Sequence, residues 1–133
     1  MQPDTREWII GISVALVVIL FASFSTVEIM IGSGVKRFTQ HAQEYFPGDR
    51  VAALTAMVDC ESCAMNDRNH AVWALGQLAD PCALPVLEKY YTGEQCDHLH
   101  MICQYELKKA LRRVRGGNNP EVVFWKWMLP EEE

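Results

Sequence analysis

The sequence predicts an all-α protein: one N-terminal transmembrane helix followed by a short α-solenoid of about two repeats with helical caps. Two observations support this fold class. The stretch from Trp8 to Val27 carries no charged residue, and a helix of that length crosses a ~30 Å hydrocarbon core at about 1.5 Å per residue. In the rest of the chain, apolar residues recur at spacings of three and four between proline and glycine stops, which is the pattern of packed helices.

The length and composition of the chain are sufficient for one small domain and one additional segment. The chain has 133 residues, of which 22% are charged and 50% are hydrophobic, with the hydrophobic excess near the N-terminus. Its net charge of -5 argues against general nucleic-acid binding. The predicted organisation is a polar tail at 1–7, a transmembrane helix and hinge at 8–34, a juxtamembrane helix and repeat domain at 35–117, and an apolar C-terminal segment with an acidic tail at 118–133.

The apolar run is interpreted as a membrane anchor. A cleaved signal peptide is the alternative, but the first residues lack a positive excess, the apolar run is too long, and no convincing cleavage site follows. Arg6 precedes the helix, whereas Lys36, Arg37 and Arg50 follow it. Since positive charge favours the cytoplasmic side, we expect a single-pass protein with its N-terminus outside and its C-terminal domain in the cytoplasm.

Small residues form a stripe on the predicted transmembrane helix. Gly11, Ala15 and Ala22 fall within about 40° of one another on an ideal helix, and small residues in line let a second helix approach closely. They are also common in any transmembrane helix, so the stripe has two interpretations. Glu28 is either an ion-pair or proton-relay residue, or a side chain that snorkels to the headgroups.

Glycine and proline punctuate the chain after the span. Gly32-Ser33-Gly34 is predicted to loosen the helix or to form a hinge, and Pro47-Gly48 ends the juxtamembrane helix that follows. Further helices are expected over about 49–59, 68–79, 82–91 and 97–115, and one after Asn119-Pro120.

The central segment from Arg68 to Tyr91 is predicted to be a helical hairpin. Asp80-Pro81 stops its first helix, because proline disfavours helical geometry in the preceding residue and suits the first turn of the next helix. The apolar stripe of the first helix comprises Ala71, Ala74, Leu75 and Leu78, and the second helix buries Leu84 and Leu87.

This segment resembles the HEAT repeat in the variety found in phycobilin lyases, R-x-x-A-x-x-A-L-G-x-L-x-D-P-x-A-L-P-x-L. The matching residues are Arg68, Ala71, Ala74, Leu75, Gly76, Leu78, Asp80, Pro81, Ala83, Leu84, Pro85 and Leu87. A repeat cannot bury its apolar face alone, and two offsets provide neighbours. Val51, Leu54 and Met57 match Leu84, Leu87 and Tyr90, while Cys60, Ala74, Leu75 and Leu78 match Cys96, Ala110, Leu111 and Val114. The resemblance implies a protein-binding surface.

All five cysteines lie in the repeat domain. Two of the loops that hold them occupy equivalent places in successive repeats, so Cys60, Cys63, Cys96 and His98, or His100 instead of His98, form a candidate tetrahedral zinc site. In an oxidising compartment, Cys60 or Cys63 would instead pair with Cys96 as a disulfide. Free thiols are the third interpretation, and Cys82 and Cys103 are interpreted as packing residues. Apart from this possible zinc, no cofactor is expected.

Two further surfaces are candidates for membrane or partner contact. Lys108 and Arg112 belong to a basic face that binds anionic headgroups or an acidic partner, unless it is merely a solvated face. Trp125, Lys126 and Trp127 resemble a membrane-interface anchor. The alternative is that the tryptophans cover the last repeat.

No catalytic triad, paired-carboxylate site, phosphate loop or helical H-E-x-x-H is present in the sequence. We therefore expect a non-enzymatic, membrane-anchored adaptor that is an accessory or scaffold subunit of a larger integral membrane complex. Its expected partners are other membrane-protein subunits and the lipid bilayer, with no nucleic acid. The alternative is a membrane-tethered metal- or redox-responsive module that uses the cysteine loops; a lyase-like activity ranks third.

Overall fold

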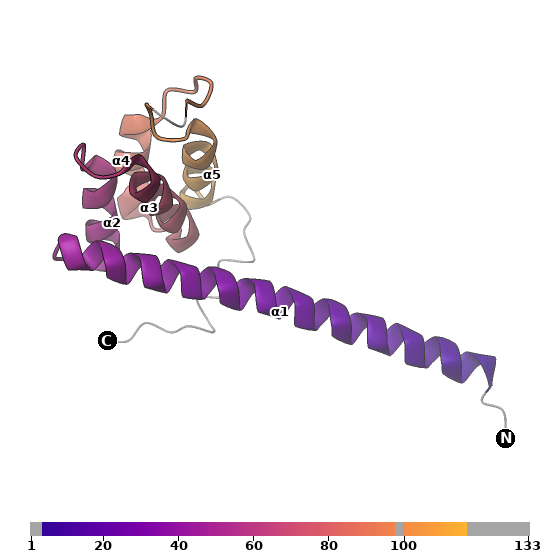
Figure 1. The fold of residues 1–133 in the computed structure, drawn as a ribbon. Helices are drawn as coiled ribbons and strands as arrows, with labels where there is room; N and C mark the ends of the chain where they lie inside the picture. The colour runs from indigo at the N-terminus through magenta and orange to yellow at the C-terminus, as the bar shows by residue number, and fades with distance from the viewer. Residues whose placement is uncertain (1–3, 98–99, 117–133) are drawn as a thin grey trace.

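The computed structural model describes residues 4–97 and 100–116, and these residues fold into helices without any strand. The all-helical class is therefore confirmed for the described part of the chain. Figure 1 shows a long N-terminal helix with the remaining helices gathered over its C-terminal half. The elements are α1 (Thr5–Tyr45), α2 (Arg50–Asp59), α3 (Met65–Leu78), the 3₁₀ helix η1 (Pro81–Ala83), α4 (Leu84–Tyr90) and α5 (Gln104–Val114).

Helix α1 runs without interruption through Gly32-Ser33-Gly34, so the predicted hinge is wrong. Packing explains the difference, because this part of the helix lies against the domain. Gly32 is buried, and a Cβ built on Gly34 would lie 3.4 Å from the Trp73 ring. Contacts of this kind outweigh the low helix propensity of two glycines. The apolar segment and the juxtamembrane helix therefore form one rod of 41 residues.

One buried seam joins α1 to the domain. Its residues alternate at spacings of four and three, which keeps them on one side of the helix, and they are Glu28, Gly32, Val35, Thr39 and Ala42. Helix α1 packs through this part of the chain on α2 and α3. Glu28 is only 1% exposed, so in this structure it belongs to the seam and does not extend into solvent as the snorkelling interpretation required.

The turn predicted at Asp80-Pro81 is confirmed. Helix α3 ends at Leu78, and its C-cap residue Ala79 adopts a left-handed conformation with φ 51°. The Asp80 carboxylate then accepts a hydrogen bond from the Cys82 N–H at 2.8 Å, and Pro81 begins η1. Beyond this turn, α4 packs mainly on α5, while α3 packs on α2 and α5. The two helices of the central segment are therefore present, but they do not pack chiefly on one another as a hairpin.

The core lies around α3. Fully buried leucines from four helices meet there: Leu54, Leu75, Leu87 and Leu107. Gly76 permits the closest approach, because a Cβ at this position would lie 2.9 Å from both Cα and Cβ of Ala110 on α5. Helix α5 begins at Gln104, with Cys103 as its N-cap residue, and not near Asp97 as the sequence predicted.

Candidate functional site

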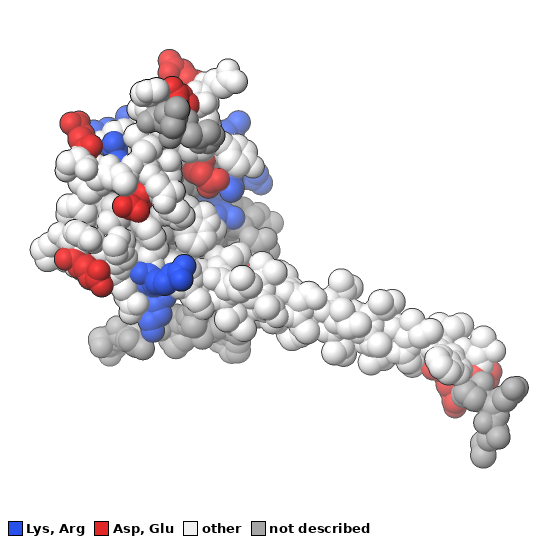
Figure 2. All heavy atoms as spheres, in the orientation of Figure 1, with Lys and Arg blue, Asp and Glu red and all other residues white. Residues whose placement is uncertain are grey.

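The first candidate site is the exposed apolar half of α1. Its most apolar 18-residue window has no buried residue, and by length and composition the helix is long and apolar enough to cross a membrane. Figure 2 shows this half of α1 without charged side chains on the displayed face except near its N-terminal end. The large exposed side chains are Trp8, Ile9, Ile10, Ile12, Val14, Leu16, Val17, Val18, Ile19, Leu20, Phe21, Phe24, Val27, Ile29 and Met30.

The small-residue stripe lies on this exposed half. A Cβ built on Gly11 would meet nothing within 4 Å. Gly11 and Ala15 lie in a shallow notch of the helix surface, which Glu7, Trp8 and Ile12 complete. Among the described residues, the notch is therefore open to a helix from another chain.

The second candidate site is a groove of about 890 Å³ formed by α1, α3, α5 and the loop before α5. We call it the α1–α3–α5 groove. It has apolar rings, amides and charges of both signs, together with two cysteines. Its lining residues are Gly34, Arg37, Phe38, Asn66, Asp67, Asn69, His70, Trp73, Cys96, Cys103, Tyr105 and Glu106.

Cys96 and Cys103 form a close pair of thiols in the wall of this groove. Their sulfur atoms are 3.3 Å apart, and the Tyr105 N–H donates to the Cys96 sulfur at 3.2 Å. This N–H belongs to the first turn of α5, and it holds the pKa of Cys96 below its ordinary value with help from the Cys103 thiol. Burial raises the pKa of Cys103. Asn69 fixes the backbone here, because its Oδ1 accepts from the Cys103 N–H at 2.8 Å.

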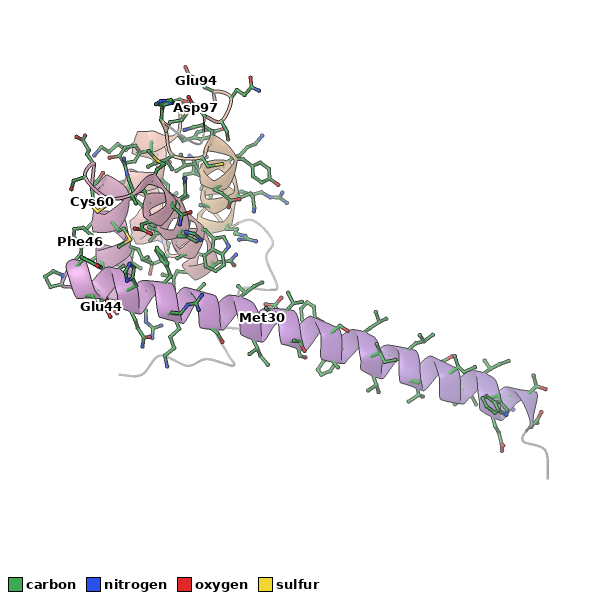
Figure 3. The ribbon with its side chains drawn as sticks, viewed as in Figure 1. Met30, Glu44, Phe46, Cys60, Glu94 and Asp97 are labelled. Carbon is green, nitrogen blue, oxygen red and sulfur yellow. A yellow bond between two sulfur atoms is a disulfide. The ribbon has the colours of Figure 1, made fainter. Side chains whose placement is uncertain are left out.

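The structure separates Cys96 from the other two cysteines of the predicted zinc site. Cys60 and Cys63 form a disulfide with one another, and Cys96 lies beside Cys103 instead. Figure 3 shows Cys60 beside α2, whereas Asp97 lies in the loop before α5. No group of three or more candidate metal ligands occurs within residues 4–97 and 100–116, and His98 lies outside them.

Of the two cysteines predicted to be packing residues, only Cys103 is buried. Cys82 is exposed and is therefore not a packing residue. Cys103 is buried, but sequence reasoning missed its pairing with Cys96. The helix predicted over about 97–115 placed Cys103 inside a helix, so no sequence signal pointed to this pairing.

A polar network joins the C-terminal ends of α2 and α4. The Asp59 carboxylate accepts from Lys89 at 2.7 Å and from the Tyr90 hydroxyl at 2.9 Å. The Lys89 hydrogen bond is the largest cause that holds the pKa of Asp59 below its ordinary value. Arg68 donates to the Val58 carbonyl at 2.9 Å and stacks over the Tyr90 ring. The network therefore holds the C-terminal ends of α2 and α4 together.

The basic face of α5 is partly neutralised. Lys109 pairs with Glu106 at 3.2 Å and Arg115 with Glu88 at 2.7 Å. Lys108 and Arg112 are exposed on the same helix. The predicted anchor of Trp125, Lys126 and Trp127 lies outside the described residues, so its role stays a prediction.

Comparison with known proteins does not assign this chain to a family. The chain matches none of the protein-family models, curated proteins or solved structures with which it was compared.

Proposed function

We propose that this chain is a non-enzymatic, single-pass membrane-anchored adaptor that acts as an accessory or scaffold subunit of a larger integral membrane complex. The continuity of α1 is the observation that carries the proposal. The same helix is exposed and apolar in its first half and buried against α2 and α3 in its second. A domain attached in this way is held at the membrane surface at a set angle to the span, as a docking platform requires.

The small-residue stripe and the buried seam lie on different sides of α1. On an ideal helix, the Gly11, Ala15 and Ala22 stripe points about 120° away from the buried seam that begins at Glu28. The domain buries residues of α1 only from Glu28 onward, so it leaves the stripe open, and a transmembrane helix of another subunit can pack there.

We also propose that the domain consists of HEAT-like repeats, and the helix packing supports this. The sequence offsets match α2 with α4 and α3 with α5. In the structure, α3 packs extensively on α5, and α2 also contacts α4, which is how equivalent helices of neighbouring repeats stack. Two repeats have little surface to bury in one another, so an open end is expected to dock a partner protein.

We place the domain in the cytoplasm because Lys36 and Arg37 follow the span directly. The Cys60–Cys63 disulfide is compatible with this side if it forms transiently, as cytosolic disulfides do. Cys82 is a free, exposed thiol, so its labelling can show on which side of the membrane the domain lies. A membrane-impermeant maleimide should label Cys82 only after the cells are permeabilised. Labelling in intact cells would place the domain outside.

Site-directed photo-crosslinking tests the adaptor function. A photoreactive residue at Ala15 should crosslink the native chain to another membrane protein, while one at Leu20, on the opposite side of the helix, should not. Gly11→Leu should reduce recovery of that protein by about tenfold and leave the thermal unfolding of the domain unchanged. Purification as a monomer in mild detergent, with no crosslink at either position, would contradict the proposal.

A redox-responsive module is the second candidate function, and the Cys96–Cys103 pair is the observation that favours it. The metal-responsive version has less support, because a Cys60–Cys63 disulfide removes two of the four proposed ligands. Elemental analysis and thiol counting test both versions. Five freely alkylated thiols without zinc, both before and after treatment with an oxidant, would leave neither version supported, whereas a bound chromophore would favour the lyase-like activity.

A further inference from the structure

We propose that Cys96 and Cys103 form a thiol–disulfide exchange site that reduces the disulfide of a short peptide bound in the α1–α3–α5 groove. This site rests on the second candidate function, because it uses the same Cys96–Cys103 pair, and it is independent of the adaptor role, because it involves neither the apolar half of α1 nor a partner subunit. It also does not involve Cys60 and Cys63, which lie in another loop.

The two sulfur atoms are positioned to bond to one another. Their separation of 3.3 Å exceeds a covalent S–S bond by about 1.3 Å. Cys96 lies in the loop before α5, and Cys103 immediately precedes that helix. A small movement of the loop residue therefore closes the bond while the helix stays in place.

The surroundings assign a different role to each cysteine. Cys96 is partly exposed in the groove wall, and the Tyr105 N–H directed at its sulfur stabilises a thiolate. Cys103 is buried, and Asn69 holds its backbone. Cys96 is therefore the attacking thiol, and Cys103 is the thiol that resolves the mixed disulfide.

The groove determines the class of substrate. Its volume of about 890 Å³ suits a ligand of a few residues. Phe38 and Trp73 provide apolar contact, Arg37 provides a positive charge, and Asp67 provides a negative charge. A short peptide with a carboxylate, an amine and a disulfide matches this lining.

The reaction balances without a further reagent. The Cys96 thiolate attacks one substrate sulfur; the substrate S–S bond breaks, and its second sulfur leaves and takes a proton. Cys103 then loses its proton and attacks the Cys96 sulfur, which breaks the mixed disulfide and releases the first substrate sulfur as a thiol. The substrate gains two electrons and two protons, and Cys96 and Cys103 lose them in becoming a disulfide.

The test uses the full-length protein in detergent, glutathione disulfide as the probe, and mass spectrometry to locate each adduct. Wild-type protein should form the Cys96–Cys103 disulfide and release two glutathione thiols. Cys103→Ser should accumulate glutathione on Cys96. In Cys96→Ser, modification of Cys103 should be at least about tenfold slower than modification of Cys96 in the Cys103→Ser protein.

Cys82 provides an internal control. It is more exposed than Cys96, but hydrogen bonding to Asp80 raises the pKa of its thiol. At about pH 7, Cys96 of the Cys103→Ser protein should therefore react several-fold faster than Cys82 of the same molecule. Equal rates, or no trapped adduct in a Cys103→Ser protein with wild-type circular dichroism, would overturn the exchange site.

A groove variant tests where the peptide binds. Asn66 is exposed in the groove lining, and Asn66→Trp should slow the reaction with glutathione disulfide at least about fivefold. The reaction with the smaller hydroxyethyl disulfide should change less than twofold. If Asn66→Trp leaves both rates unchanged, the peptide does not bind in the groove, and that part of the proposal is wrong.

Discussion

The buried amide of Gln104 stabilises the loop between α4 and α5. Its Oε1 accepts from the Thr92 N–H at 2.9 Å and from the Gly93 N–H at 3.3 Å. Its Nε2 donates to the carbonyls of Tyr90 and Ile102, both at 3.1 Å. One side chain therefore satisfies four backbone groups, which positions the loop that holds Cys96.

Gln104→Leu should lower the free energy of unfolding by at least about 2 kcal/mol, because it leaves buried backbone groups without partners. Urea unfolding followed by circular dichroism measures the change. Gln95→Leu, at an exposed position of the same loop, is the control and should change stability by less than about 0.5 kcal/mol. Similar losses for the two variants would contradict the role assigned to Gln104.

Asp59 links stability to pH. The hydrogen bond from Lys89 is the largest cause that lowers the pKa of Asp59 below its ordinary value of 3.8. A carboxylate with a lowered pKa in the folded state stabilises that state above its unfolded pKa. The stabilisation is lost as the pH falls through the folded value.

Asp59→Asn should therefore destabilise the protein near pH 7 and have progressively less effect as the pH falls below about 4. The decrease in the free energy of unfolding should not exceed about 1 kcal/mol, because the Asp59 side chain is 43% exposed and solvent screens the ion pair. Unfolding at several pH values provides the measurement. In a Lys89→Met background the effect should be smaller, and an effect independent of both pH and Lys89 would exclude this linkage.

Helices α1 and α3 each contain a glycine whose role depends on the neighbouring element. Gly34 of α1 faces the Trp73 ring, where a Cβ would make ordinary contact at 3.4 Å. Gly76 of α3 faces the backbone of α5, where a Cβ would lie only 2.9 Å from the Ala110 Cα. Helix propensity favours alanine at both positions by up to about 1 kcal/mol. Any difference between the two glycine-to-alanine substitutions in their effect on stability should therefore come from packing.

Gly34→Ala should raise the free energy of unfolding by up to about 1 kcal/mol. Gly76→Ala should lower it by about 1–3 kcal/mol, because α3 and α5 must move apart. Thermal and urea unfolding of the two variants in parallel test the pair, and each serves as the control for the other. Changes of the same sign would show that the α3–α5 contact is less tight than the structure indicates.

In the whole molecule, α1 divides at Glu28 into a half that the domain does not cover and a half that forms part of its core. Before Glu28, no residue of α1 is buried. After it, Val35 and Ala42 are almost fully buried, and Phe38 packs against the same core. The anchor and the domain therefore share one helix while only its second half contributes to domain stability.

Removing residues 1–27 should leave the domain folded with an unchanged thermal midpoint. Removing residues 1–45 should lower the free energy of unfolding by about 3 kcal/mol or more, because it exposes the apolar surfaces of α2 and α3 that α1 covers. Circular dichroism melting of the fragments 28–133 and 46–133 compares the two. Equal stability of these fragments would show that α1 is only an anchor.

Local signals were sufficient where a property depends on neighbouring residues alone. The apolar run of α1 and the stop at Asp80-Pro81 were both visible in the sequence. They depend on helical periodicity and on the fixed φ of proline. By itself the sequence determined that the protein is helical, that its N-terminal half-helix is apolar, and that Asp80-Pro81 ends a helix.

Tertiary structure alone decided how those helices were used. Gly32-Ser33-Gly34 has the composition of a hinge, yet contacts with residues far along the chain, Trp73 among them, keep it helical. Cys96 pairs with Cys103 because Gln104 and Asn69 tie the loop and the start of α5 to distant segments. Such contacts depend on which distant residues pack against one another. The free energy of this packing exceeds the weak conformational propensity of a local segment.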